Sequence, residues 1–388
     1  MGLLAAALAG ASARRAPPRP VRPGVDVLFS DSLRLVAGRR IGLLANAAAV
    51  DRAGVLTIDR FARSPATRLV ALFAPEHGIR GQAAPGAVVA DTVDAATGLP
   101  IYSLYGPGRG APTPTQLGAI DLLVVDLPDV GTRTWTYVTT MLRAMRAARA
   151  AGRPVVVLDR PDPIGCAVQG PVLDTAYASA IGPLPVPLRH GMTLGELARF
   201  ANGVLGIGAE LHVVPVDGWR RCEWLDRTGL PFVRPSPNLP DLEALAWYPG
   251  TVLFEATNLS TGRGTDAAFR QVGAPWLDAG RVARLMRASY GLALDTVRFT
   301  PHEPGDGKYA DTLVRGLRFP RADRARGDPV RDALRLLAVI GRVHPSELRV
   351  DSLGLARRLG VRAVPGKFSW PEQVRAFLLR RGPFLLYR

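Results

Sequence analysis

The sequence predicts an α/β fold, in which a parallel sheet among helices is followed by a smaller α+β region. Four short runs are nearly all apolar and lack the polar alternation of a half-exposed strand: residues 41–46 (IGLLAN), 68–73 (RLVALF), 120–126 (IDLLVVD) and 154–159 (PVVVLD). Strands covered on both faces have this pattern. Because helical patterns alternate with these runs, we expect βαβ units and a parallel sheet.

The other elements follow in chain order. Residues 51–63 and 137–151 have helical patterns, and Thr193 and Glu196 have the spacing of a capping box, which predicts the start of a helix. A further strand is expected at 211–216, and from there the chain changes character. The second region is predicted to contain a helix at 281–290, a strand at 296–300, a helix at 329–343 and a last helix near 371–381.

Length and composition allow two domains. The chain has 388 residues, of which 47% are hydrophobic and 21% charged. These fractions are typical of globular proteins, and a domain usually takes roughly 100–200 residues. We therefore expect two domains, or one large domain with an appendage.

The net charge of +16 comes from 49 Lys and Arg residues against 33 Asp and Glu residues. The arginines are spread along the chain, whereas a nucleic-acid reader carries a localised basic stripe or a known motif. We therefore expect no nucleic-acid partner. A polyanionic wall or membrane surface is an equally good reason for a positive charge.

The N-terminal segment resembles part of an export signal. Residues 1–13 (MGLLAAALAGASA) are an apolar run that ends in the small-x-small pattern of a signal-peptidase site, but they lack a positive n-region. We interpret residues 1–23 as an incomplete signal peptide and a Pro/Arg-rich linker, with a disordered Ala-rich tail as the alternative. An exported protein, periplasmic or extracellular, is expected, and a cytoplasmic location stays open. No run is long enough for stable membrane insertion.

Several absences exclude classes of function. Two cysteines are too few for a disulfide scaffold or a multi-cysteine metal module, and the five histidines form no His-x-x-x-His pair. The chain has no Gly-x-x-x-x-Gly-Lys phosphate loop, no strand-adjacent Gly-x-Gly-x-x-Gly and no Gly-x-Ser-x-Gly elbow. We therefore expect neither a metal nor a cofactor, and neither a serine esterase nor a dinucleotide enzyme.

Polar loops follow three of the predicted strands, at residues 74–78 (APEHG), 126–133 (DLPDVGTR) and 159–163 (DRPDP). Ligands of open α/β sheets bind outside the carboxyl ends of the strands. The sequence therefore predicts a pocket at this edge.

Glu76 is the first catalytic candidate. It follows a proline at the mouth of a buried strand, where a carboxyl group partly removed from water could act as a general acid near neutral pH. Alternatively, Glu76 caps the next helix or pairs with Arg80.

Asp126 and Asp129 lie three residues apart in a loop with Arg133. Paired carboxylates suit acid/base work, metal binding or recognition of sugar hydroxyl groups. The alternative is an Asx-turn with an Asp–Arg ion pair that holds the loop. Asp159 and Asp162 indicate a rigid turn, from which Arg160 could contact a substrate.

Further polar residues fall in loops that do not suit a core. His190 precedes the helix at Thr193, and a ligand contact and a plain turn role are both open. Asn238, Glu255, Asn258 and Arg263 match sugar hydroxyl and acetamido groups, or a carboxylate in the case of Arg263. Alternatively, Arg263 fixes its loop to Glu255.

Taken together, the ordered motifs resemble the NamZ-type exo-β-N-acetylmuramidases. The motifs are APEHGIRG (74–81), TGLPIYSLYG (97–106), DLPDVGTRTWTY (126–137), VLDRPDPIG (157–165), PLRHGMTLGELA (187–198), PSPNLP (235–240), YPGTVLFEATNLSTGRGT (248–265) and GAPWLD (273–278). The resemblance covers the chain from about residue 24 to the end and is strongest over residues 70–280.

The resemblance implies an exo-acting glycoside hydrolase that removes N-acetylmuramic acid from the non-reducing ends of peptidoglycan fragments. It implies a Rossmann-like catalytic domain, here residues 24–250, and a smaller α+β domain, residues 251–388, that closes the active-site cleft. It assigns the catalytic role to Glu76. The residues at matching motif positions, expected to bind substrate, are His77, Asp126, Asp129, Arg133, Tyr137, Arg160, His190, Asn238, Glu255, Asn258 and Arg263.

Details of the reaction stay open at this point. Retaining, inverting and substrate-assisted mechanisms are all compatible with the sequence, as is any oligomeric state. The lactyl carboxylate of muramic acid needs a cation, which Arg133, Arg160 or Arg263 could supply.

The chain departs from the family pattern at four positions. Pro128 stands where the family usually has Gln, Asp162 where it has Asn, Ala256 where it has Gly, and Thr261 where it has Glu. The last change removes a carboxylate beside Arg263. A non-catalytic or altered-specificity binder of peptidoglycan fragments is therefore the alternative function.

Overall fold

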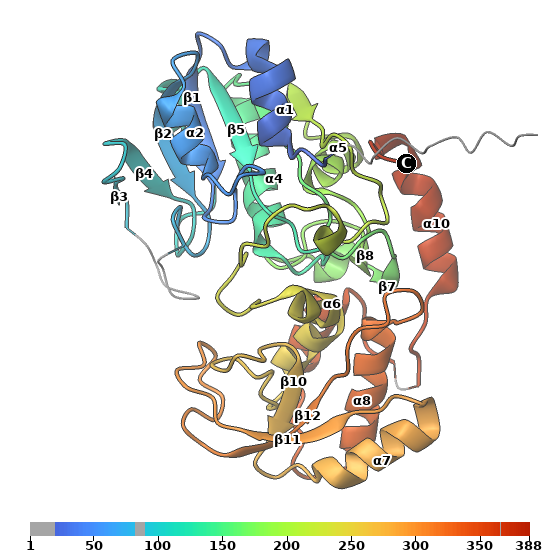
Figure 1. Cartoon of the computed structure of the whole chain (residues 1–388). Helices are drawn as coiled ribbons and strands as arrows, with labels where there is room; N and C mark the ends of the chain where they lie inside the picture. The colour runs from blue at the N-terminus through green and yellow to red at the C-terminus, as the bar shows by residue number, and fades with distance from the viewer. Residues whose placement is uncertain (1–19, 82–89, 365) are drawn as a thin grey trace, which may run out of the picture.

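A computed structural model describes residues 20–81, 90–364 and 366–388 and shows two lobes (Figure 1). The helices are α1 (Gly24–Asp31), α2 (Thr57–Arg63), α3 (Pro114–Gly118), α4 (Thr136–Ala150), α5 (Leu194–Val204), α6 (Leu242–Thr251), α7 (Ala279–Tyr290), α8 (Pro329–Val343), α9 (Ser352–Leu359) and α10 (Pro371–Arg381). The strands are β1 (Arg40–Ala45), β2 (Arg68–Ala74), β3 (Thr92–Val93), β4 (Pro100–Ser103), β5 (Leu122–Asp126), β6 (Val155–Leu158), β7 (Gln169–Val172), β8 (Pro187–Arg189), β9 (Leu211–Val214), β10 (Gln271–Ala274), β11 (Asp295–Phe299) and β12 (Val314–Arg318).

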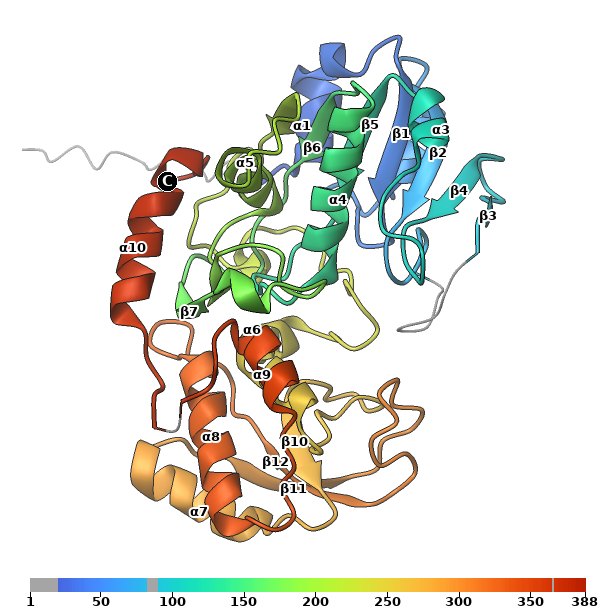
Figure 2. The same cartoon turned by 180° about the vertical axis from the view of Figure 1, so that it is seen from behind.

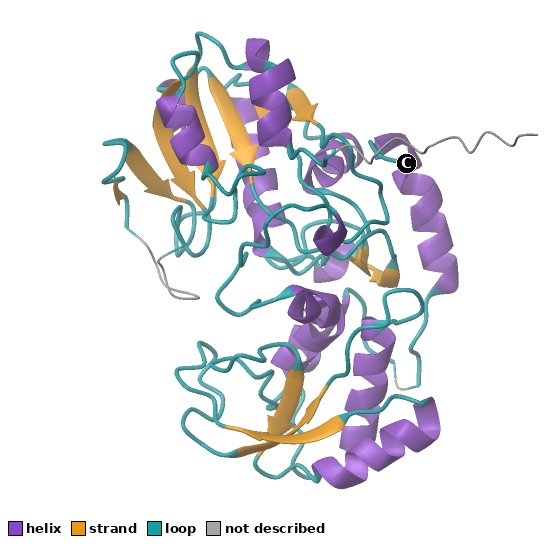
Figure 3. Ribbon diagram, viewed as in Figure 1, coloured by secondary structure: helices purple, strands orange, loops and turns teal. Residues whose placement is uncertain are grey.

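The first lobe is built on a seven-stranded sheet in the order β3-β4-β2-β1-β5-β6-β9 (Figure 3). All neighbouring strands pair in parallel except β3, which lies antiparallel to β4 at the edge. Without β3, the strands follow the doubly wound order 3-2-1-4-5-6 of the Rossmann fold, with the switch point between β1 and β5. The predicted Rossmann-like parallel sheet is confirmed.

Both faces of this sheet are covered, which explains the apolar runs. Along β1, Leu43 packs among α1 and α2, whereas Leu44 faces the other side and packs with α4. Val124 and Val125 of β5 divide between the same two clusters. Since side chains alternate between the faces of a strand, a strand with two covered faces needs apolar residues at every position.

The second lobe contains the three-stranded antiparallel sheet β10-β12-β11, against which α7 and α8 pack (Figure 2). Helices at α7, α8 and α10 and a strand at β11 match the predicted segments closely. The short strands β3, β4, β7 and β8 were not predicted, since two to four residues leave little periodicity to detect. No helix in the described part of the chain is long and apolar enough to cross a bilayer.

The end of the chain returns to the first lobe, where α10 runs back beside α5 (Figures 1 and 2). Phe377 and Phe384 both pack edge-on against Phe200 of α5. The Tyr387 hydroxyl donates a hydrogen bond to buried Asp159 at 2.5 Å and accepts one from the Val216 amide at 2.9 Å. The last residues therefore complete the core of the first lobe, and the proposed boundary at residue 250 stays a prediction.

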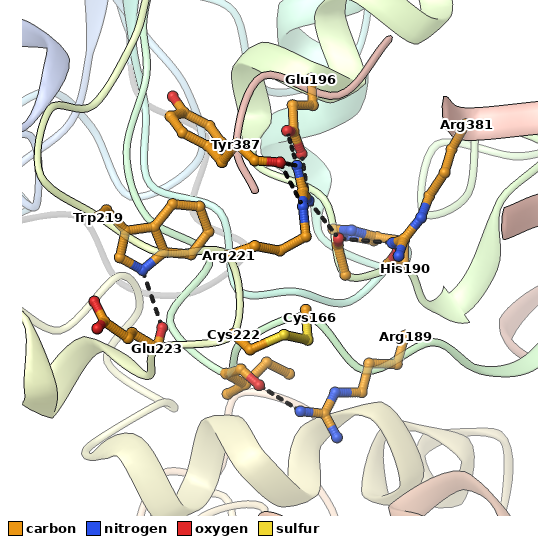
Figure 4. Close-up of a disulfide and its surroundings, with 12 residues drawn as sticks. Cys166, Arg189, His190, Glu196, Trp219, Arg221, Cys222, Glu223, Arg381 and Tyr387 are labelled. Atoms are coloured by element: carbon orange, nitrogen blue, oxygen red, sulfur yellow. Dashed lines mark hydrogen bonds and ion pairs between the residues drawn. A yellow bond between two sulfur atoms is a disulfide. The ribbon is translucent and has the colours of Figure 1, made fainter. Parts of the chain in front are cut away.

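Cys166 and Cys222 form a disulfide, which the sequence did not predict. Figure 4 shows the bond beside the Arg221–Glu196 ion pair and the carbonyl groups to which Arg381 donates. The bond joins the loop after β6 to the segment after β9, across a sequence separation of 56 residues.

Reduction of this disulfide is expected to lower the free energy of unfolding by about 2–4 kcal/mol, because a cross-link across a loop of this size restricts the unfolded chain. Urea unfolding followed by tryptophan fluorescence, with and without dithiothreitol, measures the difference. A Cys166→Ser/Cys222→Ser double variant is the control and should not respond to the reductant. Equal stability of the oxidised and reduced wild-type protein would contradict the expectation.

Candidate active site

An open cavity is lined by residues from both lobes. From the first lobe come the turn after β2 and the segment that leads into α4, and from the second come the end of α6 and the loop before β10. The lining residues are Glu76, His77, Tyr105, Thr134, Trp135, Thr136, Ile181, Ser236, Asn238, Leu239, Tyr248, Val252, Glu255, Arg263 and Phe269.

Glu76 lies in a tight turn directly after β2. The Gly78 amide donates to the Pro75 carbonyl at 3.1 Å, and His77 and Gly78 both have left-handed backbone, with φ of 71° and 75°. A non-glycine residue rarely adopts this conformation, so the surrounding structure must hold it. The turn aims the Glu76 carboxyl group into the cavity.

Hydrogen bonds from α4 fix Glu76. The Thr136 hydroxyl donates to Oε2 of Glu76 at 3.0 Å, and the Tyr137 hydroxyl donates to its backbone carbonyl at 2.9 Å. Tyr105 lies on the same side, where burial, the Glu76 charge and a hydrogen bond to Glu76 raise its pKa. Arg80, the partner that the sequence offered, instead pairs with Asp94 and Asp59.

Glu255 brings a second carboxyl group into the cavity from the second lobe. Arg263 donates to its Oε1 from Nε at 3.0 Å and also from Nη2, and Arg358 approaches Oε2 at 3.4 Å. The Arg263 guanidinium also lies 5.0 Å above the centre of the Phe269 ring. The predicted loop contact between Arg263 and Glu255 is therefore present, and both groups still line the cavity.

Asn238 and His77 complete the polar lining that the sequence predicted. Asn238 is almost buried, and within the described residues its Nδ2 has no hydrogen-bond partner. An amide donor that is buried and unpaired at a cavity wall suits an oxygen of a ligand.

The structure places Asp126 and Arg160 outside this cavity. Arg160 donates to both oxygens of the fully buried Asp126, at 2.6 and 2.8 Å, and to the Val50 carbonyl at 2.8 Å. The Thr57 hydroxyl also donates to Asp126 at 2.6 Å. These partners occupy both oxygens of Asp126 and all three nitrogens of Arg160. The ion pair therefore stabilises the fold by joining the segments that contain Val50, Asp126 and Arg160.

Arg133, Asn258 and Tyr137 also serve as internal braces. Arg133 donates to the carbonyls of Pro171, Val186 and Arg358. The Asn258 amide group exchanges hydrogen bonds with the backbone of residues 347 and 349. Tyr137 lies behind Glu76 rather than beside the cavity.

Asp129 and His190 lie together in the interior of the first lobe. The Gly131 amide donates to Asp129 Oδ2 at 2.8 Å, which is the Asx-turn that the sequence offered as the alternative. His190 Nε2 lies 3.4 Å from the same oxygen. Neither residue lines the cavity that contains Glu76.

A second, smaller hollow lies outside the ends of β1, β5 and β6. Its walls are mostly proline and aliphatic residues, such as Pro161 and Pro231, and its charged lining residues are Asp51, Asp129 and Arg160. Although this is the switch point where Rossmann folds bind nucleotides, the lobe lacks a glycine-rich phosphate loop. The cavity with two glutamates is therefore the better candidate for catalysis.

The four departures from the family pattern lie outside the cavity lining. Thr261 is fully buried, and its hydroxyl has no partner within the described residues. Arg263 pairs with Glu255 instead, so it keeps a carboxylate partner. Pro128 accepts a hydrogen bond from the Trp135 indole, Ala256 is buried beside α9, and Asp162 is buried beside Asp129.

Sequence reasoning missed Tyr105, Thr136 and Arg358. Tyr105 and Thr136 stand in the SLYG and TRTWTY motifs, where their position beside Glu76 could have been suspected. Arg358 lies in α9, far along the chain from Glu255, and no local pattern connects the two.

Comparisons with known proteins agree with this geometry. The family model "Exo-beta-N-acetylmuramidase NamZ, N-terminal" matches residues 41–243, and the corresponding C-terminal model matches residues 246–387. A peptidoglycan β-N-acetylmuramidase NamZ of Bacillus subtilis (strain 168) is 40% identical over 337 residues, which cover 86% of this chain and 80% of that protein.

Two crystal structures of DUF1343 family proteins from Bacteroides fragilis are also similar. One, at 29% identity, aligns with a TM-score of 0.85 over 96% of this chain and 100% of its own. The other, also at 29% identity, aligns with a TM-score of 0.71 over 95% and 99%. By both family matches and the extended identity to the Bacillus protein, the chain belongs to the NamZ family of exo-β-N-acetylmuramidases.

Proposed function

We propose that the protein is an exo-acting β-N-acetylmuramidase, a glycoside hydrolase that removes terminal N-acetylmuramic acid from the non-reducing end of peptidoglycan fragments. One observation carries the proposal: Glu76 of the first lobe and Glu255 of the second line the same cavity, together with the guanidinium of Arg263. Glycosidases use two carboxyl groups in this way. The name of the Bacillus relative supports the substrate.

Glu76 acts as the general acid and protonates the glycosidic oxygen as the bond to the anomeric carbon breaks. The Thr136 hydroxyl donates to Oε2 and so orients the carboxyl group that carries the proton to the substrate. Because Tyr137 anchors the backbone of the same residue, the carboxyl group is held in one orientation.

Glu255 is the second carboxyl group. Its ion pairs with Arg263 and Arg358 hold it at the cavity wall, where a carboxylate can stabilise positive charge at the anomeric carbon, activate water or attack that carbon. Asp126, the other carboxylate that the sequence offered for this task, is occupied by Arg160 and Thr57.

Arg263 is the arginine best placed to bind the lactyl carboxylate of muramic acid. The guanidinium groups of Arg133 and Arg160 are engaged by backbone carbonyls and by Asp126, and neither residue lines the cavity. Arg263 does line it, and its Nη1 has no recorded contact with Glu255. A substrate carboxylate could take that position through a charge-assisted hydrogen bond.

Replacement of the general acid is expected to abolish most of the activity. Glu76→Gln should lower kcat by about 10²–10⁴-fold on a muramic-acid-terminated disaccharide, because the amide cannot donate the proton. Glu210→Gln, at a glutamate whose side chain is 69% exposed, is the matched control and should retain the wild-type rate. An equally active Glu76→Gln would refute the acid role. If the wild type binds the sugar in calorimetry without turnover, the protein is instead a binder of wall fragments.

Glu255→Gln should also lower kcat by about a hundredfold or more, and NMR of the released sugar at early times should show one anomer. If the wild type retains the configuration of the sugar and azide restores activity to the variant, Glu255 is the nucleophile. If the wild type inverts the configuration, Glu255 is the general base. A variant with the wild-type rate would remove Glu255 from the reaction and assign the second role to the substrate's acetamido group.

Arg263→Lys is expected to weaken selection for the lactyl group. Calorimetric titration with N-acetylmuramic acid and with N-acetylglucosamine, which lacks the lactyl group, should show about a tenfold loss for the first sugar and little change for the second, because lysine cannot reproduce the planar guanidinium. Arg298→Lys, on the exposed surface of β11, is the control. Equal losses for the two sugars would contradict a contact with the carboxylate.

We also propose that the protein works outside the cytoplasm. The Cys166–Cys222 disulfide supports this location, since disulfides persist mainly in oxidising compartments. The proposed signal peptide of residues 1–13 lies outside the described residues. Maleimide labelling of fractionated native cells should find the protein in the secreted or envelope fraction without free thiols. A cytoplasmic protein with both cysteines labelled would contradict the proposal.

A further inference from the structure

Three buried polar side chains meet in the first lobe, away from the cavity with Glu76. Asp129 follows β5, Asp162 follows β6 and His190 follows β8, and one ligand-type atom of each lies within 4.8 Å of the others. Their exposed fractions are 6%, 1% and 0%. Among the described residues, Asp129 Oδ1, Asp162 Oδ2 and His190 Nε2 have no hydrogen-bond partner.

The histidine in this group is oriented as a donor. The Met192 amide donates to His190 Nδ1 at 3.2 Å, so Nδ1 carries the lone pair and the proton of the neutral ring is on Nε2. Nε2 lies 3.4 Å from Asp129 Oδ2. Burial, and then the charges of Arg381, Arg133 and Arg189, lower the pKa of His190 to about 3, so the ring is neutral at physiological pH. A metal ion on Nε2 would need the lone pair that this tautomer lacks.

The two carboxyl groups each keep one oxygen without a partner. The Gly131 amide donates to Asp129 Oδ2 at 2.8 Å, and the Ile164 amide donates to Asp162 Oδ1 at 3.1 Å. The packing is tight, since a Cβ added at Gly131 would lie 2.7 Å from Asp162 Oδ1. Two buried carboxylates this close repel each other, and a proton shared between them removes the repulsion.

The surrounding charges do not neutralise the pair. Arg189 and Arg381 attract Asp162, but Arg189 donates to the Ile164 carbonyl and to Gln169, and Arg381 donates to the carbonyls of His190 and Gly191. On the other side, Asp159 repels Asp129. Glu196 of α5 repels Asp162 and is itself paired with Arg221. Burial raises the pKa of Asp129 to about 7, and burial and then the Asp129 charge raise the pKa of Asp162 well above its usual value.

We propose that Asp162 is a positioning residue that keeps its proton at neutral pH, donates it from Oδ2 to Oδ1 of Asp129, and so joins the loop after β6 to the loop after β5. The second of these loops leads directly into Thr136, which holds the carboxyl group of Glu76. The catalytic consequence, though not the proton itself, depends on the proposed function. Asparagine, which the family usually has here, would supply an amide donor that cannot ionise.

The proposal predicts how stability depends on pH. The unfolded chain releases the Asp162 proton above about pH 4, whereas the folded protein keeps it. Since the folded state then binds more protons, the folding equilibrium constant falls by up to about tenfold per pH unit as the pH rises, until the folded protein also releases this proton.

Urea unfolding of wild type and Asp162→Asn from pH 5 to pH 9 tests this. The variant should lose less stability as the pH rises, and the ratio of the two unfolding constants should change by up to about tenfold per pH unit. Asp295→Asn, at an exposed position of β11, is the matched control and should run parallel to the wild type. An Asp162→Asn curve that is also parallel to the wild type would overturn the proposal.

The pH profile of kcat on a muramic-acid-terminated disaccharide tests the positioning role. The general acid limits the alkaline side of every variant, so the wild type should lose activity more steeply there than Asp162→Asn, and Asp162→Leu, which cannot donate, should have a lower kcat at all pH values. Identical profiles of wild type and Asp162→Asn would overturn the positioning role. The Asp162 proton would then affect only the stability of the fold. If the wild type hydrolyses no muramide, the proposed function fails, and the unfolding curves still decide whether the proton is held.

Discussion

The active site depends on one buried guanidinium that joins the two lobes. Arg133 donates to the carbonyls of Pro171 and Val186 in the first lobe and to the carbonyl of Arg358 in the second. Arg358 in turn contacts Glu255, and Arg133 stands shortly before Thr136, the partner of Glu76. A short path of hydrogen bonds and backbone therefore connects the two carboxyl groups. Glycosidases require a fixed separation between such groups, and Arg133 joins the segments that carry them.

The end of the chain adds a second connection between the lobes. After the last helices of the second lobe, α10 carries the chain back to α5, where Tyr387 and Arg381 donate to groups around the ends of β6 and β8. The disulfide closes the same region. Because the described chain passes into the second lobe and returns to the first, both crossings must bend together in any hinge motion.

The sequence predicted the helices and strands whose burial or capping leaves a regular local pattern of residues. Strands such as β1 and β5 were found because both faces are buried, and α5 because Thr193 and Glu196 satisfy its first amides. Glu76 was found because it follows directly after a predicted buried strand and stands in a motif that resembles the family pattern. Pairings between distant segments carry no such signal. From the sequence alone, Asp126 and Arg160 could be substrate ligands or partners in an ion pair. Only the structure, in which their loops lie side by side, shows that they form an ion pair.

A difference in hydrogen bonding separates structural from functional groups at the sheet edge. Asp126, Asp159 and Arg160 all stand at strand ends, and protein partners occupy both oxygens of Asp126 and Asp159 and all three nitrogens of Arg160. A group satisfied in this way gains nothing from a ligand and loses stability if it moves. In the cavity, by contrast, Asn238 Nδ2 is unpaired within the described residues. An unpaired donor that faces a cavity is available to a polar sugar, whereas the paired groups at the ends of β5 and β6 support the fold.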